Sequence, residues 1–169
     1  EYSHPDFLTF DSNTTQAMWE GGKLALATMW GSRTSGVLDD EGSTKEVVMG
    51  TEFASAPSFN GGTMPASSLW WDGFIISKNV SDADAEASFI AMMNGISPAM
   101  VQANNDAATW LIKGYKPSKA SSGVTATAMN GAAPYPMLPF IGALHGAAGS
   151  ELSDFLQGKE SASQALADM

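Results

Sequence analysis

The spacing of apolar and polar residues predicts an alternation of short helices and strands. A capping residue among positions 11–13 and the glycines at 21–22 delimit a helix over residues 14–22. A further helical turn is expected to follow Ser32. Three apolar stretches without a helix cap are predicted to be strands, over residues 23–30, 47–55 and 67–79. In the third of these, Phe74, Ile75 and Ile76 are apolar on successive positions, which predicts a strand buried on both faces.

The second half of the chain is predicted to be mostly helical. Ser81 with Asp84 resembles a capping box, and Ser97 followed by a proline is a typical helix start. Ser161 with Gln164 forms a second capping box. The predicted helices cover residues 82–95, 107–114, 140–158 (opened by Pro139) and 162–169, and a further helix begins at Pro98. Residues 115–136 are predicted to be an irregular crossing. Strands followed by helices favour an α/β fold with a largely parallel sheet.

Composition limits the classes of partner. The chain has 169 residues and a net charge of -10, which argues against nucleic acid and against anionic membrane surfaces. It has no cysteine, so disulfides, zinc–thiolate sites and thiol nucleophiles are excluded. No signal peptide and no membrane-spanning run is recognised in it. The absence of cysteine fits an exported bacterial protein; in that case its signal has been removed or lies upstream, and we expect the chain to be a fragment.

Catalytic motifs are not recognised in the sequence, and we expect no enzyme activity, no cofactor and no metal. The two histidines are His4, in a polar segment, and His145, on a helix rich in small residues. The acidic run 39–41 is typical of a solvated loop. A carboxylate pair assembled in three dimensions is the enzymatic alternative.

The tryptophans indicate a binding site more clearly. Trp30, Trp70 and Trp71 stand at the ends of predicted strands, where parallel sheets bind ligands. Packing in the core or at a hinge is the alternative for each of them. Trp19 and Trp110, on predicted helices, are interpreted as packing residues.

The residues beside these tryptophans suit a carbohydrate. Alternation along a strand places Trp70 with Asp72 on one face and Trp71 with Gly73 on the other. An indole face stacks on the C–H face of a sugar, and a carboxylate accepts from its hydroxyls. Which of the two tryptophans faces the ligand stays open. Arg33 is able to bind sugar hydroxyls or a carboxylate, or to pair with the acidic run at 39–40.

Three stretches in order resemble the C-terminal part of bacterial extracellular solute-binding proteins of the sugar-binding class, relatives of maltose-binding protein. They are "TTQAMWEGGKLALATMWGS", "VVMGTEFASAPSFNGG…LWWDGFIISKNVSDADAEASFIAMM" and "LQGKESASQALADM". The resemblance implies a two-lobed architecture of the periplasmic-binding-protein type II kind, of which this chain is the C-terminal portion. Residues 1–66 would belong to the second lobe, 67–117 to the first lobe and hinge, and 118–169 to the second lobe again.

The same resemblance implies a non-catalytic, monomeric receptor in the periplasm or outside the cell. Its two lobes would close on a sugar and deliver it to the permease subunits of an ABC importer. Another small solute, such as a polyol, a glycoside or a small acid held by Arg33, is the alternative ligand, and signalling is the alternative to import. The resemblance and the strand ends together predict these ligand-binding residues: Trp30, Gly31, Ser32, Arg33, Trp70, Trp71, Asp72 and Gly73.

Overall fold

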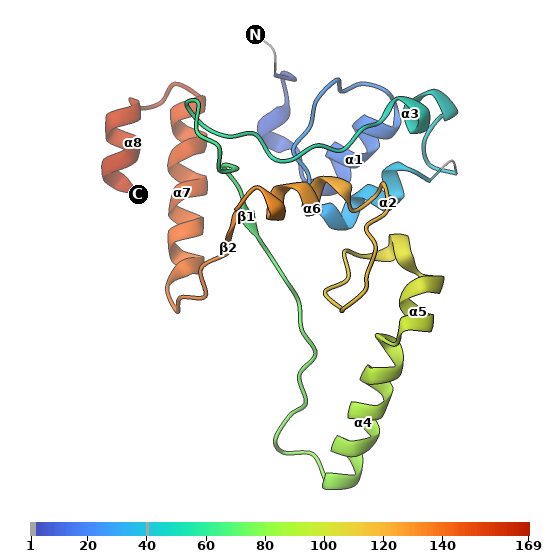
Figure 1. Ribbon diagram of the computed structural model, residues 1–169. Coiled ribbons are helices and arrows are strands. Elements are labelled where there is room, and N and C mark those ends of the chain that lie inside the picture. The colour runs from blue at the N-terminus through green and yellow to red at the C-terminus, as the bar shows by residue number, and fades with distance from the viewer. Residues whose placement is uncertain (1–2, 40) are drawn as a thin grey trace. The chain divides into compact units, whose positions relative to one another are not determined.

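A computed structural model describes residues 3–39 and 41–169 of the chain (Figure 1). It divides into two compact units. One comprises Asp11–Ala133, and the other comprises Glu1–Phe10 with Pro134–Met169. The assignment of 1–66, 67–117 and 118–169 to two lobes stays a prediction.

The larger unit contains most of the regular structure. In chain order its elements are α1 (Ser12–Glu20), η2 (Gly31–Arg33), α2 (Thr34–Val37), α3 (Lys45–Gly50), β1 (Ser68–Leu69), α4 (Asp82–Gly95), α5 (Pro98–Ala103), η3 (Asn105–Ala107) and α6 (Ser122–Met129). The smaller unit contains η1 (Phe7–Thr9), α7 (Ile141–Leu156) and α8 (Ala162–Asp168). The short strand β2 (Ala133–Pro134) pairs with β1 in a two-stranded parallel sheet.

Four of the predicted helix starts are confirmed by their side-chain caps, whereas Ser32 makes no capping hydrogen bond. Asp11 accepts the Thr14 N–H at 2.7 Å, and this charge-stabilising hydrogen bond lowers the pKa of Asp11. Ser81, Ser97 and Ser161 each accept a backbone N–H three residues further on, at the starts of α4, α5 and α8. A cap needs only residues within one turn, which explains why the sequence located these helices well.

Two of the three predicted strands are wrong. The strand predicted over 47–55 is replaced at its start by α3, which covers residues 45–50. Thr44 caps this helix by accepting the Val47 N–H at 3.3 Å. Residues 23–30 have no regular secondary structure, and Leu26 is 90% exposed. Apolar residues without a helix cap form a strand only where a neighbouring strand takes their backbone hydrogen bonds.

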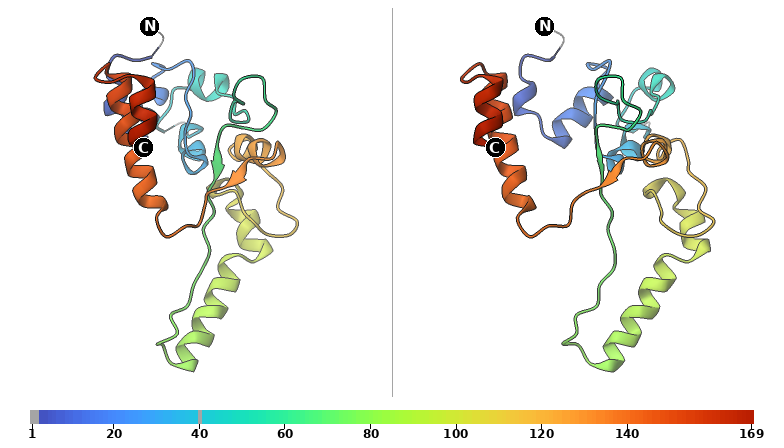
Figure 2. Two further views of the ribbon diagram at one scale, coloured as in Figure 1. Left: turned by 90° about the vertical axis from the view of Figure 1, so that its left-hand side faces the viewer. Right: turned by 60° about the vertical axis from the view of Figure 1, so that its left-hand side comes forward.

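The third predicted strand is confirmed only at its start. β1 covers Ser68–Leu69, and the chain then runs as an extended segment to the turn before α4 (Figures 1 and 2). The expected burial of this segment is wrong within the unit, since Phe74 is 63% and Ile75 is 92% exposed. The backbone after Leu69 would form a longer strand only if a neighbouring strand accepted and donated its hydrogen bonds.

Two further predictions fail between α5 and β2. The expected helix over 107–114 is replaced by the single turn η3, followed by irregular chain. The expected irregular crossing instead contains α6, whose small residues gave no periodic signal. Helix α6 is anchored by Thr127, whose Oγ1 accepts the Ala56 N–H at 2.9 Å and donates to the Gly123 carbonyl at 2.7 Å.

The buried side chains of the larger unit are small. Thr51, the largest one that is fully buried, accepts the Trp19 indole N–H at 2.9 Å and donates to the Val47 carbonyl. This bond supports the interpretation of Trp19 as a packing residue. The buried apolar residues of this unit are Val37, Val101, Ala120 and Ala132.

The smaller unit is a helical hairpin with one terminal turn. Gly158, with a φ of 72°, ends α7 as its N–H bonds to the Phe155 carbonyl, and α8 then packs against α7. Ala165 on α8 is 2% exposed and is the buried apolar residue of this hairpin. The helices predicted over 140–158 and 162–169 are thereby confirmed as α7 and α8.

Candidate functional site

Two of the predicted ligand residues meet in the larger unit. The rings of Trp30 and Trp70 lie 5.6 Å apart between centroids at an interplanar angle of 86°, an edge-to-face pair. Trp30 is 50% and Trp70 is 51% exposed, so the pair presents aromatic surface to solvent. Such a surface can stack on a sugar ring while staying part of the fold.

The turn after Trp30 positions its indole. Arg33 donates its backbone N–H to the Trp30 carbonyl at 3.0 Å, which closes η2, and the Thr34 hydroxyl donates to the Gly31 carbonyl at 2.7 Å. Gly31 lies directly against α6, and a Cβ built on it would overlap the Val124 Cγ2 atom. Glycine at position 31 thus lets η2 lie close to α6, and this contact positions the preceding residue, Trp30.

Arg33 takes part in a polar chain with α1. Its Nη1 lies 3.5 Å from the Gln16 Oε1, and the Gln16 Nε2 donates to the Glu20 carboxylate at 2.7 Å. The predicted alternative, an ion pair with Asp39, is not formed, and Asp40 lies outside the described residues. Arg33 is half-buried and is held at the turn by an amide, which leaves its charge able to bind an acidic or hydroxylated ligand.

The remaining predicted residues are solvent-exposed. Trp71 is 60% exposed, and its ring lies beside Gly73, where an added Cβ would be 3.8 Å from the Trp71 Cζ3 atom. Ser32, Asp72 and Gly73 are exposed as well. The structure therefore brings Trp70 to Trp30, and it leaves Trp71 and Asp72 along the extended segment.

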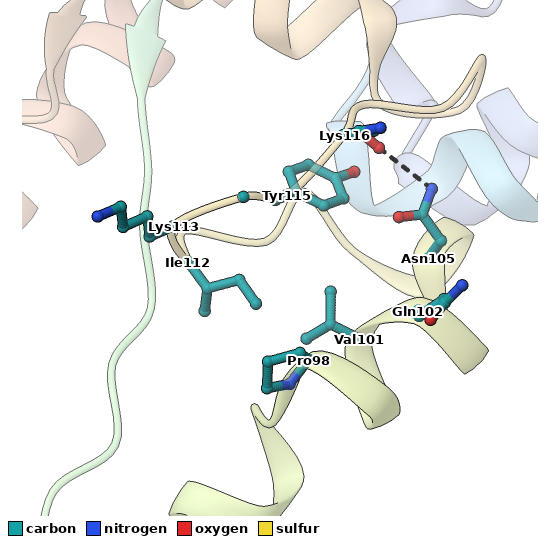
Figure 3. Close-up of a pocket in the computed structure, with 9 residues that line it drawn as sticks. Pro98, Val101, Gln102, Asn105, Ile112, Lys113, Tyr115 and Lys116 are labelled. Carbon is teal, nitrogen blue, oxygen red and sulfur yellow. Dashed lines mark hydrogen bonds between the residues drawn. The ribbon is translucent and has the colours of Figure 1, made fainter.

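A hollow elsewhere in the larger unit was not predicted from the sequence. A hollow of about 420 Å³ lies between α5 and the loop that follows η3 (Figure 3). It is lined by Pro98, Val101, Gln102, Asn105, Ile112, Lys113, Gly114, Tyr115 and Lys116, none of which is among the eight predicted site residues. The sequence signal that marks it is the pair of lysines beside Tyr115, in a chain with few cations.

The hollow has an apolar floor and a polar rim. Figure 3 shows Ile112 directed toward Val101 and Pro98, with Asn105 at the opposite end. The Asn105 Nδ2 donates to the Lys116 carbonyl at 3.3 Å and ties the loop to the end of α5. Tyr115 is engaged elsewhere, because its hydroxyl donates toward the Ala108 carbonyl or the Ser121 hydroxyl. The hollow suits a small apolar group better than a polyhydroxylated ring.

The histidines have local partners. The His4 Nδ1 accepts the Asp6 N–H at 3.2 Å, and its ring lies 4.9 Å from that of Phe10. The His145 Nδ1 lies 3.3 Å from the Tyr135 hydroxyl. These contacts join residues within ten positions of each histidine along the chain.

Three carboxylates converge in the helical hairpin. Glu151, Glu160 and Asp168 each offer an oxygen within 4.8 Å of the others, and the Glu160 Oε1 is buried without a hydrogen-bond partner among the described residues. Partial burial, and then the negative charges of Glu151, Asp168 and Asp154, raise the pKa of Glu160 above its ordinary value of 4.5. The nearby ion pair between Lys159 and Asp154, at 2.7 Å, offsets only part of this charge.

The raised pKa predicts that acid stabilises this hairpin. The folded state holds the Glu160 proton more tightly than the unfolded state, so stability is lost as pH rises above about 4.5 through the raised pKa. Glu160→Gln should remove this dependence and raise the thermal midpoint at neutral pH. Thermal unfolding followed by circular dichroism between pH 4.5 and 8 measures both effects.

Glu86→Gln provides the matched control, since Glu86 is exposed on α4, outside the carboxylate cluster. Its unfolding profile with pH should follow that of the unmodified chain. An unchanged profile for Glu160→Gln as well would contradict the assignment of the effect to Glu160.

Comparison with known protein families, with curated proteins and with solved structures returned no match. Among the described residues, no helix is long and apolar enough to cross a membrane.

Proposed function

We propose that this chain is part of a non-catalytic receptor that binds a carbohydrate. The single observation that carries the proposal is the half-exposed edge-to-face pair formed by Trp30, directly before η2, and Trp70, directly after β1. Aromatic side chains that present part of their surface to solvent beside a polar group are a usual means by which a protein holds a sugar ring. Arg33, with its amide partner Gln16, supplies the adjacent polar group.

The resemblance of the sequence to solute-binding proteins supports the rest of the proposal. In this proposal the chain is the C-terminal portion of a two-lobed α/β protein of the periplasmic-binding-protein type II kind. It acts outside the cytoplasm, closes on the sugar and delivers it to the permease subunits of an ABC importer. Ser32, Trp71, Asp72 and Gly73 are the further candidate ligand contacts, on the turn and on the extended segment.

A different small solute is the second candidate function. Arg33 favours a ligand with a carboxylate, because a guanidinium binds that group with two parallel hydrogen bonds. An acidic sugar would use both the aromatic pair and Arg33. A panel that includes a neutral hexose, its uronic acid and a polyol therefore separates the ligand classes.

Titration of the protein with that panel tests the proposal. Tryptophan fluorescence should change, because Trp30 and Trp70 border the ligand, and the thermal midpoint should rise as ligand exceeds its dissociation constant. Recovery of chemically intact sugar after long incubation separates a receptor from a carbohydrate-active enzyme. A panel with no responding sugar, alongside a clear response to another solute, would overturn the carbohydrate assignment.

A further inference from the structure

Residues 57–66 of the larger unit form a short hairpin. The Ala66 N–H donates to the Pro57 carbonyl at 2.8 Å, which closes the base of the hairpin. One step further in, Ser58 and Pro65 form an antiparallel bridge. This pairing closes the stretch between Ser58 and Pro65 into a loop.

The tip of this hairpin is a type I′ turn. The Gly62 N–H donates to the Phe59 carbonyl at 2.9 Å, and the two residues between them are Asn60 and Gly61. Their φ angles are 50° and 75°, both positive, as this type of turn requires. Asparagine and glycine are the residues that adopt this conformation most readily. The turn therefore accounts for an asparagine that directly precedes a glycine.

The reacting groups of the Asn60–Gly61 pair have no partner that holds them. Both residues are exposed, and a Cβ built on Gly61 would meet no atom within 4 Å. Among the described residues, none forms a hydrogen bond with the Asn60 side chain or with the Gly61 N–H. A glycine nitrogen also has no neighbouring side chain to shield it, so the preceding side-chain amide is able to approach it closely.

We propose that Asn60 is the residue at which the folded chain undergoes spontaneous deamidation. The Gly61 nitrogen attacks the Asn60 Cγ atom, the new N–Cγ bond closes a five-membered succinimide ring, and the Cγ–Nδ2 bond breaks. The side-chain nitrogen leaves as ammonia and takes up the proton that the Gly61 nitrogen loses. Water then opens the ring at either carbonyl and leaves aspartate or isoaspartate at position 60. No oxidant or reductant is needed, and water is the co-reactant.

The chain contains two further Asn-Gly pairs, and the structure restrains the attacking nitrogen in each. Gly95 is the last residue of α4, a helix in which each N–H donates to the carbonyl four residues earlier. The Gly131 N–H, directly after α6, donates to a carbonyl of that helix at 3.0 Å. Each nitrogen must leave its hydrogen bond before it attacks Asn94 or Asn130. We therefore expect Asn60 to react first.

The reaction changes both the charge and the backbone of the hairpin tip. Either product places a carboxylate where a neutral amide stood. Isoaspartate also carries the main chain through its Cβ and Cγ atoms, which lengthens the turn between Phe59 and Gly62 and disrupts the hydrogen bond that closes it. The reaction needs only water and the residues of the turn, so the proposal does not rest on the proposed sugar binding.

Incubation of the folded full chain at mildly alkaline pH, followed by peptide mass spectrometry, tests the proposal. Cleavage after lysine separates the three sites, because Lys78 and Lys119 lie between them. Conversion of amide to acid at position 60 should be at least about fivefold faster than at 94 and 130, the factor that one broken hydrogen bond of about 1 kcal/mol provides. Isoaspartate should be present at position 60. In denaturant, which removes the restraining hydrogen bonds, the three sites should react at similar rates.

Asn60→Gly is the matched control, because glycine suits the positive φ of this position and lacks the amide. This variant should form no acidic product at position 60 and should keep the circular dichroism spectrum of the unmodified chain. Equal rates at the three sites of the folded chain would overturn the proposal, and so would a faster reaction at 94 or 130. A preference for position 60 that persists unchanged in denaturant would also contradict it, because the fold would then not select the site.

Discussion

Replacing Trp30 with alanine is expected to weaken binding of the responding sugar by about tenfold or more, a loss of about 1.4 kcal/mol. The indole supplies half of the edge-to-face pair with Trp70, so its removal takes away a stacking surface and leaves the second ring without support. Trp70→Ala should have an effect of the same order. Isothermal titration of each variant with the sugar identified by the panel measures the change.

Folding should be largely retained in both variants, because each ring is half-exposed and its removal opens no enclosed cavity. Trp30→Phe is the conservative control and should recover most of the affinity through the remaining aromatic face. Trp71→Ala resolves the question that the sequence left open. If only that variant loses affinity, the ligand binds along the other face of the segment and the pair of Trp30 with Trp70 is a packing contact.

Gly31→Ala is expected to destabilise the larger unit by about 1–3 kcal/mol, the usual range for forcing an extra methyl group into a packed contact. The added Cβ would overlap the Val124 Cγ2 atom, so η2 and α6 must separate. Chemical denaturation followed by circular dichroism gives the free energy of unfolding. Because η2 begins directly after Trp30, sugar affinity should fall together with stability.

A double variant isolates the contact. Val124→Ala removes the atom that meets the new methyl group, so Gly31→Ala combined with Val124→Ala should be less destabilised than the sum of the two single changes. Ser32→Ala is the matched control, since Ser32 is exposed on the same turn, and its free energy of unfolding should change little. If the changes in the free energy of unfolding of Gly31→Ala and Val124→Ala simply add in the double variant, Gly31 does not contact Val124.

The elements whose formation depends on neighbouring residues were predictable from the sequence. The starts of α4, α5 and α8 were predicted because a serine side chain caps each of them within one turn. The strands failed for the opposite reason. Residues 23–30 and the stretch after Leu69 have apolar patterns that fit a sheet, but a strand exists only through hydrogen bonds to a neighbour that a local pattern cannot name.

The candidate site divides in the same way. The sequence by itself determined that tryptophans stand beside Gly31 and Gly73, and that Arg33 follows within one turn of Trp30. Only the tertiary structure decided that Trp70 is the residue that meets Trp30, and that the hollow beside α5 exists. Capping and turn formation depend on atoms a few residues apart, whereas ring packing and concavity depend on where distant segments come together. The chemical character of each residue was therefore predictable from the sequence, whereas the residues that surround it are determined by the fold.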